Sequence, residues 1–255
     1  WTMLGMMLIG FFLIPVPISW DIRGWTEMYP VNGPAWSLFY EYIANILYAL
    51  ILRKLSNTIL FILMFIAGGA LIHLAVTSPN GDIIGGWAIS PEQIRIGLTR
   101  LMFPFLAGIL LRRYFKPTSI KNAFLLTSIL LTIFLVFPRV GGETQVWLNG
   151  IYDSGIVIFI FPIIVYLGAS GKIEGQFSNK VCKFLGDISY PLYITHYPIV
   201  YVFYGWVNRN NISLADSIPM AILTIIISIS FAYLALKVYD TPVRKWLTER
   251  YLVKK

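Results

Sequence analysis

The sequence predicts an all-α protein that crosses a membrane several times. Of its 255 residues, 57% are hydrophobic and only 13% are charged, whereas a soluble domain carries about 25% charged residues. The mean hydropathy is +0.72. Apolar stretches also recur along the chain, and each approaches the roughly 20 residues that a helix needs to cross a hydrocarbon core about 30 Å thick. These observations favour a polytopic membrane protein.

The apolar stretches predict about eight transmembrane helices, taken in chain order. Polar connectors such as Asp21–Pro34 and Ser78–Pro91 supply the breaks between them. We expect one membrane domain over 1–238 and a tail over 239–255. The predicted spans are 1–19, 36–52, 57–77, 94–111, 120–138, 154–170, 184–205 and 214–237.

Basic residues are distributed unevenly between alternate connectors. Fifteen of the 20 Lys and Arg residues fall on one side, and the positive-inside rule makes that side cytoplasmic. Seven of the 12 acidic residues fall on the other side. Both chain ends are then predicted to be cytoplasmic. The 15 basic residues are Arg53, Lys54, Arg112, Arg113, Lys116, Lys121, Lys172, Lys180, Lys183, Lys237, Arg244, Lys245, Arg250, Lys254 and Lys255.

The tail predicts a separate amphipathic helix on the cytoplasmic membrane surface. Asp240 or Thr241 can cap it, and Pro242 suits a first helical turn. Basic residues occupy one face of this helix, as is typical of an interfacial anchor. The apolar residues that share the other face are Val243, Trp246, Leu247 and Tyr251.

Glu41 is the most informative residue, because it places a carboxylate about five residues inside a predicted span. An ionisable group in a membrane is costly and marks a functional site by default. A polar stripe on such a helix must face protein or water. The stripe at helical spacing consists of Ser37, Glu41, Asn45 and Tyr48.

Two further polar residues are predicted at a similar depth. Arg100 lies about 9 Å inside the fourth span, and His196 lies in the outer half of the seventh, between Pro191 and Pro198. Glu41, Arg100 and His196 are therefore candidates for one buried cluster. The alternatives are a structural Glu41–Arg100 ion pair, and a His196 that only hydrogen-bonds a backbone carbonyl.

Several classes of protein and site find no support in the sequence. The net charge is +8, but the charges lie in short clusters without the aromatic interleaving of a nucleic-acid surface. Cys182 is the only cysteine, so no intrachain disulfide and no metal-ligand spacing exists. No phosphate-binding glycine loop, nucleophile elbow or paired-histidine zinc motif is present.

Two stretches in a fixed order resemble membrane acyltransferase family 3. The first, Pro34-Ala35-Trp36-Ser37-Leu38-Phe39-Tyr40-Glu41, resembles the family's Trp-Ser-Leu-x-x-Glu element. The second, Phe184-Leu185-Gly186-Asp187-Ile188-Ser189-Tyr190-Pro191-Leu192-Tyr193-Ile194-Thr195-His196-Tyr197-Pro198, is similar to its late-helix element. Weaker support comes from Arg100–Gly108 and Tyr239–Arg244. The resemblance covers nearly the whole chain.

The resemblance implies about ten membrane helices and a bacterial inner-membrane O-acyltransferase. Such an enzyme moves an acyl group, usually acetyl, from cytoplasmic acyl-CoA to an extracytoplasmic sugar or glycan, with no tightly bound cofactor. Glu41 is expected to orient the catalytic histidine. Arg112, Arg113 and Lys116 could attract the CoA phosphates or could serve only as topology signals. The expected substrate-binding residues are Trp36, Ser37, Asn45, Arg100, Tyr193 and His196.

The sequence departs from the family at its N-terminal end. The family's first helix carries an arginine and the histidine expected to be the catalytic base, and neither is found here. We therefore expect Trp1 to be preceded by further helices that supply this histidine, and we expect residues 1–255 alone to be inactive. The catalytic role is not transferred to His196.

Two other functions fit the same features. A secondary transporter or flippase for a glycan or lipid intermediate would also combine polytopic architecture, buried ions and a tyrosine-rich channel. A shortened, inactive acyltransferase remnant is the other alternative. Radiolabelled acyl-CoA would separate the first two, because a transferase labels its acceptor whereas a transporter leaves its substrate unchanged.

Overall fold

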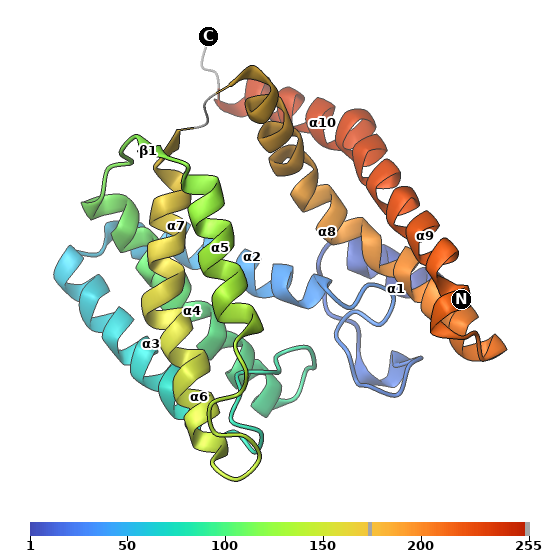
Figure 1. Cartoon of the computed structure of the whole chain (residues 1–255), viewed down its shortest axis with the longest axis horizontal. Helices are drawn as coiled ribbons and strands as arrows, with labels where there is room; N and C mark the ends of the chain where they lie inside the picture. The colour runs from blue at the N-terminus through green and yellow to red at the C-terminus, as the bar shows by residue number, and fades with distance from the viewer. Residues whose placement is uncertain (173–174, 253–255) are drawn as a thin grey trace. The chain divides into compact units, whose positions relative to one another are not determined.

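The computed structural model describes residues 1–172 and 175–252, and helices dominate it (Figure 1). This confirms the predicted all-α class. Two compact units divide the chain. Unit 1 comprises Trp1–Met28 and Trp36–Glu174, and unit 2 comprises Tyr29–Ala35 and Gly175–Lys255.

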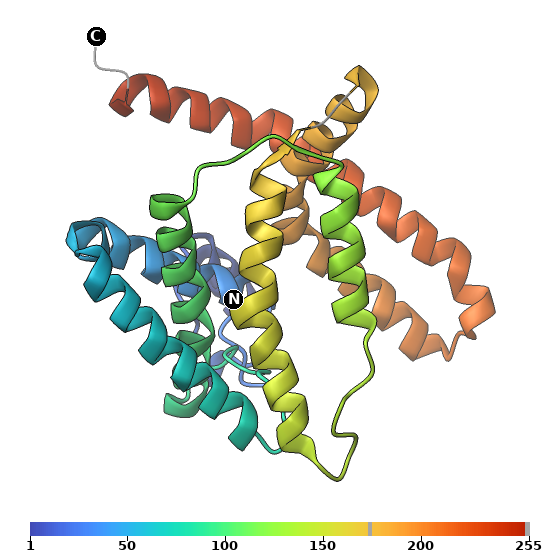
Figure 2. The same cartoon turned by 60° about the vertical axis from the view of Figure 1, so that its left-hand side comes forward.

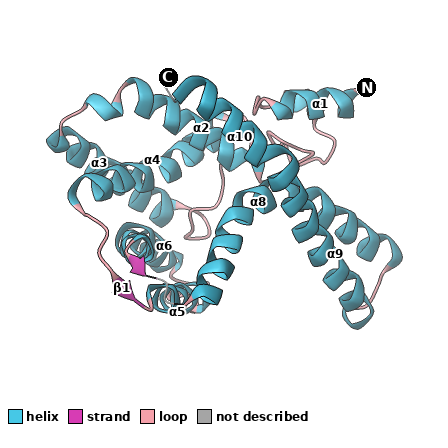
Figure 3. Cartoon of the chain, turned by 90° about the horizontal axis from the view of Figure 1, so that it is seen from above, coloured by secondary structure: helices cyan, strands magenta, loops and turns pink. Residues whose placement is uncertain are grey.

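Unit 1 is built on long apolar helices that pack side by side. Helix α3 contacts α4 and α6, and α7 contacts α4 and α5. Figure 2 shows α5 and α7 running alongside each other, and Figure 3 shows α5 and α6 end-on beside β1. The elements of unit 1 are α1 (Thr2–Phe11), a 3₁₀ turn (Ile18–Trp20), α2 (Ala35–Leu50), a 3₁₀ turn (Leu52–Lys54), α3 (Asn57–Thr77), α4 (Pro91–Tyr114), β1 (Ile120–Lys121), α5 (Ala123–Val136), α6 (Val146–Gly155), a π-turn (Ile156–Ile160), α7 (Phe161–Ala169) and β2 (Gly171–Lys172).

The core of unit 1 lies between α3 and α4. Leu60, Leu71 and Leu106 are fully buried there. Gly68 allows close approach, since a β-carbon at this position would lie 3.2 Å from the Phe103 ring. Because lipid is as apolar as leucine, such contacts stabilise membrane helices through packing rather than through exclusion of water.

Serine caps fix where α3 and α4 begin. The Ser56 hydroxyl accepts a hydrogen bond from the Ile59 amide at 3.3 Å, and the Ser90 hydroxyl accepts one from the Gln93 amide at 3.2 Å. Both bonds satisfy amides that the first helical turn leaves without partners. The predicted span 57–77 is confirmed as a helix with the same bounds.

The connectors of unit 1 alternate between two ends, as a chain that crosses back and forth requires. At one end, Arg113 hydrogen-bonds the α2–α3 connector, and β1 pairs in parallel with β2. At the other end, Arg139 donates to the carbonyls of Asn80 and Gly81. The alternation of connectors on which the orientation was predicted is therefore found in unit 1.

Unit 2 is a helical hairpin of α8 (Gln176–Asn210) and α9 (Leu214–Ala235), which pack against each other. Asn211 makes the turn in a left-handed conformation, with φ of 50°. The Ser213 hydroxyl caps α9 by accepting a hydrogen bond from the Asp216 amide at 3.2 Å. The hairpin continues into a π-turn (Leu236–Asp240), α10 (Thr241–Leu247) and a π-turn (Thr248–Leu252).

The predicted break before the C-terminal helix is wrong. Asp240 has helical backbone angles (φ −63°, ψ −51°) and makes no capping hydrogen bond; its carboxylate pairs with Arg244 one turn later. The π-turn that precedes Pro242 accommodates the missing proline N–H, so the helix continues without a cap. Residues 253–255 of the predicted tail lie outside the described residues.

The predicted first span is also shorter than expected. The helix ends at Phe11, because Pro15 and Pro17 cannot donate to a continuing ladder. Among the described residues, four helical stretches are long and apolar enough to cross a membrane: Asn57–Thr77, Pro91–Tyr114, Val146–Ala169 and Leu214–Tyr251. Two shorter apolar helices are Thr2–Phe11 and Ala123–Val136. The total of eight spans stays a prediction.

Candidate functional site

The start of α2 and the middle of α4 form a polar corner in unit 1. The Arg100 guanidinium lies over the Trp36 ring, 4.9 Å from its centroid. Arg100 also donates to the Gly85 carbonyl. A cation–π contact of this kind is worth about 0.5–2 kcal/mol. Two of the predicted substrate-binding residues, Trp36 and Arg100, are therefore in direct contact.

Glycines allow this corner to close. Gly86 has φ of +104°, and a β-carbon on it would lie 2.9 Å from the Gly97 Cα and 3.0 Å from the Trp36 ring. Only glycine adopts that backbone conformation without strain. The Gln93 side-chain oxygen accepts a hydrogen bond from the Gly86 amide at 2.6 Å, and this bond holds the loop against α4.

Tyr40 fills the space behind Trp36. Its ring contacts the Trp36 ring edge-on, with centroids 6.0 Å apart, and packs against Gly97. The side chain is buried, and its hydroxyl makes no hydrogen bond within the described part of the chain. A buried hydroxyl without a partner is uncommon and costs stability.

Asp82 lies in the same loop as Gly85, whose carbonyl accepts a hydrogen bond from Arg100. It is buried in the loop before α4, where it accepts hydrogen bonds from the Ser78 hydroxyl at 3.2 Å and the Ile84 amide at 3.1 Å. Glu41 makes no ion pair with Arg100. The alternative of a structural Glu41–Arg100 pair is therefore wrong.

Glu41 instead lies on an exposed face of α2. Asn45 and Tyr48, from the same predicted stripe, are exposed as well, whereas Ser37 is half-buried. The Asn45 side-chain amide donates to the Glu41 carbonyl at 2.9 Å. No described residue covers the Glu41 carboxylate, so the predicted protein-facing stripe is not covered in this structure.

His196 lies half-buried on α8, in unit 2. Its Nδ1 is 2.8 Å from the Leu192 carbonyl and 3.0 Å from the Tyr193 carbonyl. Since carbonyl oxygens only accept hydrogen bonds, Nδ1 must carry the hydrogen, and in the neutral ring Nε2 then carries the lone pair. The expected hydrogen bond to a backbone carbonyl is confirmed. Whether His196 joins a cluster with Glu41 and Arg100 stays a prediction, because those residues belong to unit 1.

The loop before Trp36 docks on α8 beside His196. Pro198 has no N–H, so the Ile194 carbonyl loses its helical donor; the Asn32 side-chain amide takes that place at 2.8 Å. The Tyr193 hydroxyl donates to the Pro34 carbonyl at 2.9 Å. Both hydrogen bonds lie within unit 2 and hold the Asn32–Pro34 segment on α8.

Tyrosine rings extend this surface along α8. Tyr193 and Tyr197 flank the His196 ring, with centroids 6.3 Å and 6.4 Å away. Tyr197 stacks on Tyr201, with centroids 5.7 Å apart and an interplanar angle of 25°. Gly33 lies against the Tyr197 ring. The row is partly exposed, and such rings can both pack against neighbours and offer a face to a sugar.

The basic residues predicted to attract CoA phosphates differ in whether they hydrogen-bond other parts of the protein. Arg113 donates to the carbonyls of Leu52, Arg53 and Leu55 and to the Asn57 side chain. It therefore holds the α2–α3 connector in place. The side chains of Arg112 and Lys116 are exposed. The sequence showed the charge cluster but not which arginine has a structural task.

Three polar groups of the Asp21–Tyr29 segment have shifted pKa values. Hydrogen bonds from the backbone amides of Arg23 and Thr26 lower the pKa of Asp21. Burial raises the pKa of Glu27, against the opposing charge of Arg23 at 2.7 Å. Burial also raises the pKa of Tyr29. None of the described residues form a His, Cys, Asp and Glu cluster that could hold a metal ion.

Sequence reasoning missed the residues that complete the Trp36–Arg100 corner. In the sequence, Tyr40 is one of many aromatic residues and Asp82 is an acidic residue of a connector. The one available signal for this corner was the Gly85-Gly86 pair, which lets the loop approach α4. Asn32 carried no signal at all, because its task arises from Pro198 far along the chain.

Comparisons with known proteins identify relatives. A family model described as "Acyltransferase domain" matches residues 1–237. Two proteins from Staphylococcus aureus strains COL and MSSA476, each named "Putative O-acetyltransferase", are 27% identical over 231 residues. The match covers 82% of this chain and 36% of each relative, so the chain spans about a third of their length. No solved structure matches at a comparable level.

Proposed function

The chain belongs to acyltransferase family 3, and we propose that it transfers an acetyl group from cytoplasmic acyl-CoA to a hydroxyl of an extracytoplasmic sugar or glycan. The observation that carries the proposal is the match to the acyltransferase model over residues 1–237. The names of the relatives support an O-acyltransferase. The apolar helices support a location in a membrane, and we propose the bacterial inner membrane with a cytoplasmic C-terminus.

The chemistry requires a base, a positioned thioester and a stabilised oxyanion. A base takes the proton of the acceptor hydroxyl, the oxygen attacks the thioester carbonyl carbon, and the carbon–sulfur bond breaks to release CoA, which takes up a proton. The resemblance implies that the base is the histidine of the family's first helix. Glu41 would orient that imidazole and stabilise its charged form. The exposed position of Glu41 leaves its carboxylate accessible to such a partner.

Arg100 is the proposed oxyanion or acceptor contact. The Gly85 carbonyl and the Trp36 ring hold its guanidinium in one orientation. A donor fixed before the reaction does not have to reorganise as charge develops, which is what makes such groups effective. On α8, the lone pair of His196 Nε2 can accept a hydrogen bond from a sugar hydroxyl.

Arg112 and Lys116 are the proposed contacts for the CoA phosphates. Their side chains are exposed and close together in the sequence. Arg113 contributes charge, but its donors are largely engaged by the α2–α3 connector. The transporter alternative gains no support from the comparisons, since the matched family consists of acyltransferases.

The test uses the full-length protein in membranes with radiolabelled acetyl-CoA. We expect label to appear in glycan in the presence of the protein, and we expect Glu41→Gln to lower transfer at least about 100-fold with normal membrane insertion. Glu92→Gln is the matched control, because Glu92 is exposed in the first turn of α4. Full activity of the Glu41→Gln enzyme would remove Glu41 from the mechanism, and absence of labelled glycan with the wild type would refute the proposed function.

A further inference from the structure

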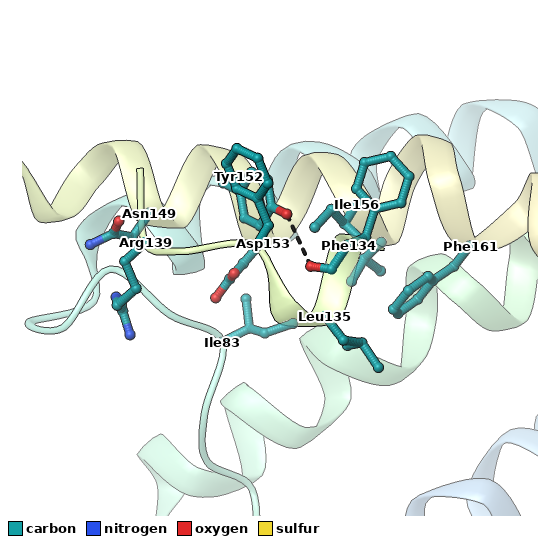
Figure 4. A pocket seen from close by; sticks show the side chains of 11 residues that line it. Ile83, Phe134, Leu135, Arg139, Asn149, Tyr152, Asp153, Ile156 and Phe161 are labelled. Atoms are coloured by element: carbon teal, nitrogen blue, oxygen red, sulfur yellow. Dashed lines mark hydrogen bonds between the residues drawn. The ribbon is translucent and has the colours of Figure 1, made fainter. Parts of the chain in front are cut away.

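Unit 1 contains a cavity of about 330 Å³ that no part of the proposed mechanism uses. It lies between the end of α5, the α6–α7 stretch and the loop before α4 (Figure 4). Phe134, Leu135 and Phe161 supply apolar walls, and Arg139 and Asp153 supply charged groups. A mostly apolar cavity with a few polar groups is the usual form of a small-molecule site.

The cavity wall is held in place by a specific hydrogen bond. The Phe134 carbonyl lies in the last turn of α5, where carbonyls have no helical donor, and Pro138 has no N–H to supply one. The Tyr152 hydroxyl donates to that carbonyl at 2.9 Å, shown as the dashed line in Figure 4. The Tyr152 ring stacks on Phe137, with centroids 5.4 Å apart. The end of α5 is therefore fixed against α6, which keeps the cavity open.

The Asp153 carboxylate needs hydrogen-bond donors that the described residues do not provide. It is half-buried, and Figure 4 shows it directed from α6 toward Ile83. Arg139 and Asp82 are the charged groups near the Asp153 carboxylate. The carboxylate makes no hydrogen bond or ion pair within the described residues. A half-buried carboxylate is stabilised when a ligand donates to it.

The charges of the cavity select the type of ligand. An anionic ligand would be repelled by Asp153 and Asp82, and Arg139 offsets part of the attraction of these carboxylates for a cationic ligand. A neutral ligand with several hydroxyl groups avoids the repulsion and supplies O–H donors to the Asp153 carboxylate. The aromatic walls offer faces on which the apolar side of a sugar ring or an alkyl chain can pack.

We propose that this cavity binds the neutral, hydroxyl-rich end of the acceptor, with Asp153 accepting hydrogen bonds from its hydroxyls. This inference rests on the proposed function. One observation and the predicted orientation connect the cavity to that function. The cavity and the polar corner share the loop before α4, because Ile83 lines the cavity and the Gly85 carbonyl accepts a hydrogen bond from Arg100. The predicted orientation also places Arg139 and Asp153 on the extracytoplasmic side, where the acceptor is expected.

A photolabelling experiment on the full-length protein in membranes tests the ligand class. The probe is octyl β-glucoside with a diazirine at the end of its alkyl chain, and labelled peptides are identified by mass spectrometry. We expect label within residues 134–161, removed by octyl β-glucoside at concentrations about tenfold lower than by octyl sulfate or octyltrimethylammonium. Equal competition by all three would overturn the inference, because it would show only an apolar crevice.

Variants separate this inference from the proposed function. Asp153→Asn should lower labelling about tenfold and raise the acceptor KM, with the acetyl-CoA KM unchanged; Glu143→Gln, an exposed acid outside the cavity, should change neither. Leu135→Trp, at the exposed rim, should block labelling by filling the cavity. Acetyl transfer without label in residues 134–161 would overturn the cavity assignment alone. Label there without acetyl transfer by the wild type would refute the proposed function alone.

Discussion

The Asn32 side-chain amide donates to the Ile194 carbonyl at 2.8 Å, across 162 positions of sequence. The bond exists because Pro198 removes the N–H that would otherwise occupy that carbonyl. It fastens the loop that leads into Trp36 to the helix that carries His196. Together with the hydrogen bond from the Tyr193 hydroxyl to the Pro34 carbonyl, it holds the Asn32–Pro34 segment on α8 within unit 2.

Asn32→Ala should destabilise unit 2 by about 1–2 kcal/mol, because it leaves the Ile194 carbonyl without a donor. Pro198→Ala restores the helical N–H, so the double variant Asn32→Ala with Pro198→Ala should recover most of the loss. Amide hydrogen exchange of residues 29–35 and thermal unfolding in detergent measure the effect. Additive losses in the double variant would contradict this account of the bond.

Gly97→Ala should destabilise unit 1 by about 1–3 kcal/mol through overpacking. The new β-carbon would lie 2.2 Å from the Tyr40 Cζ, and the Tyr40 ring is enclosed and cannot move freely. Gly108→Ala on the same helix is the control, since no heavy atom lies within 4 Å of that position. Thermal unfolding should separate the two variants, and equal melting temperatures would show that the Tyr40 contact is not tight.

Arg113→Ala should lower stability by about 1–2 kcal/mol, because it removes the donors that hold the α2–α3 connector. Arg112→Ala should leave stability within about 0.5 kcal/mol and should raise the acetyl-CoA KM if it contacts the CoA phosphates. Unfolding and steady-state kinetics on the same preparations measure both. A stability loss in Arg112→Ala equal to that of Arg113→Ala would contradict the division of roles.

Acidification should loosen the loop at Asp21. Its folded pKa is lowered, so its contribution to stability is present above the ordinary value of 3.8 and is lost as the pH falls through the lower folded value. The fluorescence difference between the wild type and Trp25→Phe should change in that range, because Trp25 lies against Arg23 at 4.7 Å. Asp21→Asn should abolish the transition, and an unchanged acid midpoint in that variant would assign it to another group.

The helices were predictable where apolar length and a capping serine coincide. Asn57–Thr77 follows Ser56, and its bounds were predicted correctly. The break before the C-terminal helix was predicted wrongly. Asp240 and Pro242 are compatible both with the start of a new helix and with a π-turn inside a continuing helix. Only packing of α9 and the π-turn against α8 decides between them.

The site was predictable in its residue types and not in its contacts. Depth along the helices selected Arg100 and Glu41, but the sequence could not show that Arg100 would engage Gly85 and Trp36 instead. Such choices depend on glycines that let the loop before α4 approach Trp36. The sequence shows Pro198 near His196, whereas the donor that replaces the missing proline N–H, Asn32, is identified only by the fold.

The π-turn Leu236–Asp240 changes the direction in which the side chains after it point from the helix. A turn that holds an extra residue rotates all later side chains by about 100° around the axis, since each residue of an α-helix accounts for that angle. The Trp246 side chain is therefore out of phase with the α9 residues packed on α8. A single uninterrupted rod can thus present unrelated surfaces before and after residue 240, and the two halves can vary in sequence independently of each other.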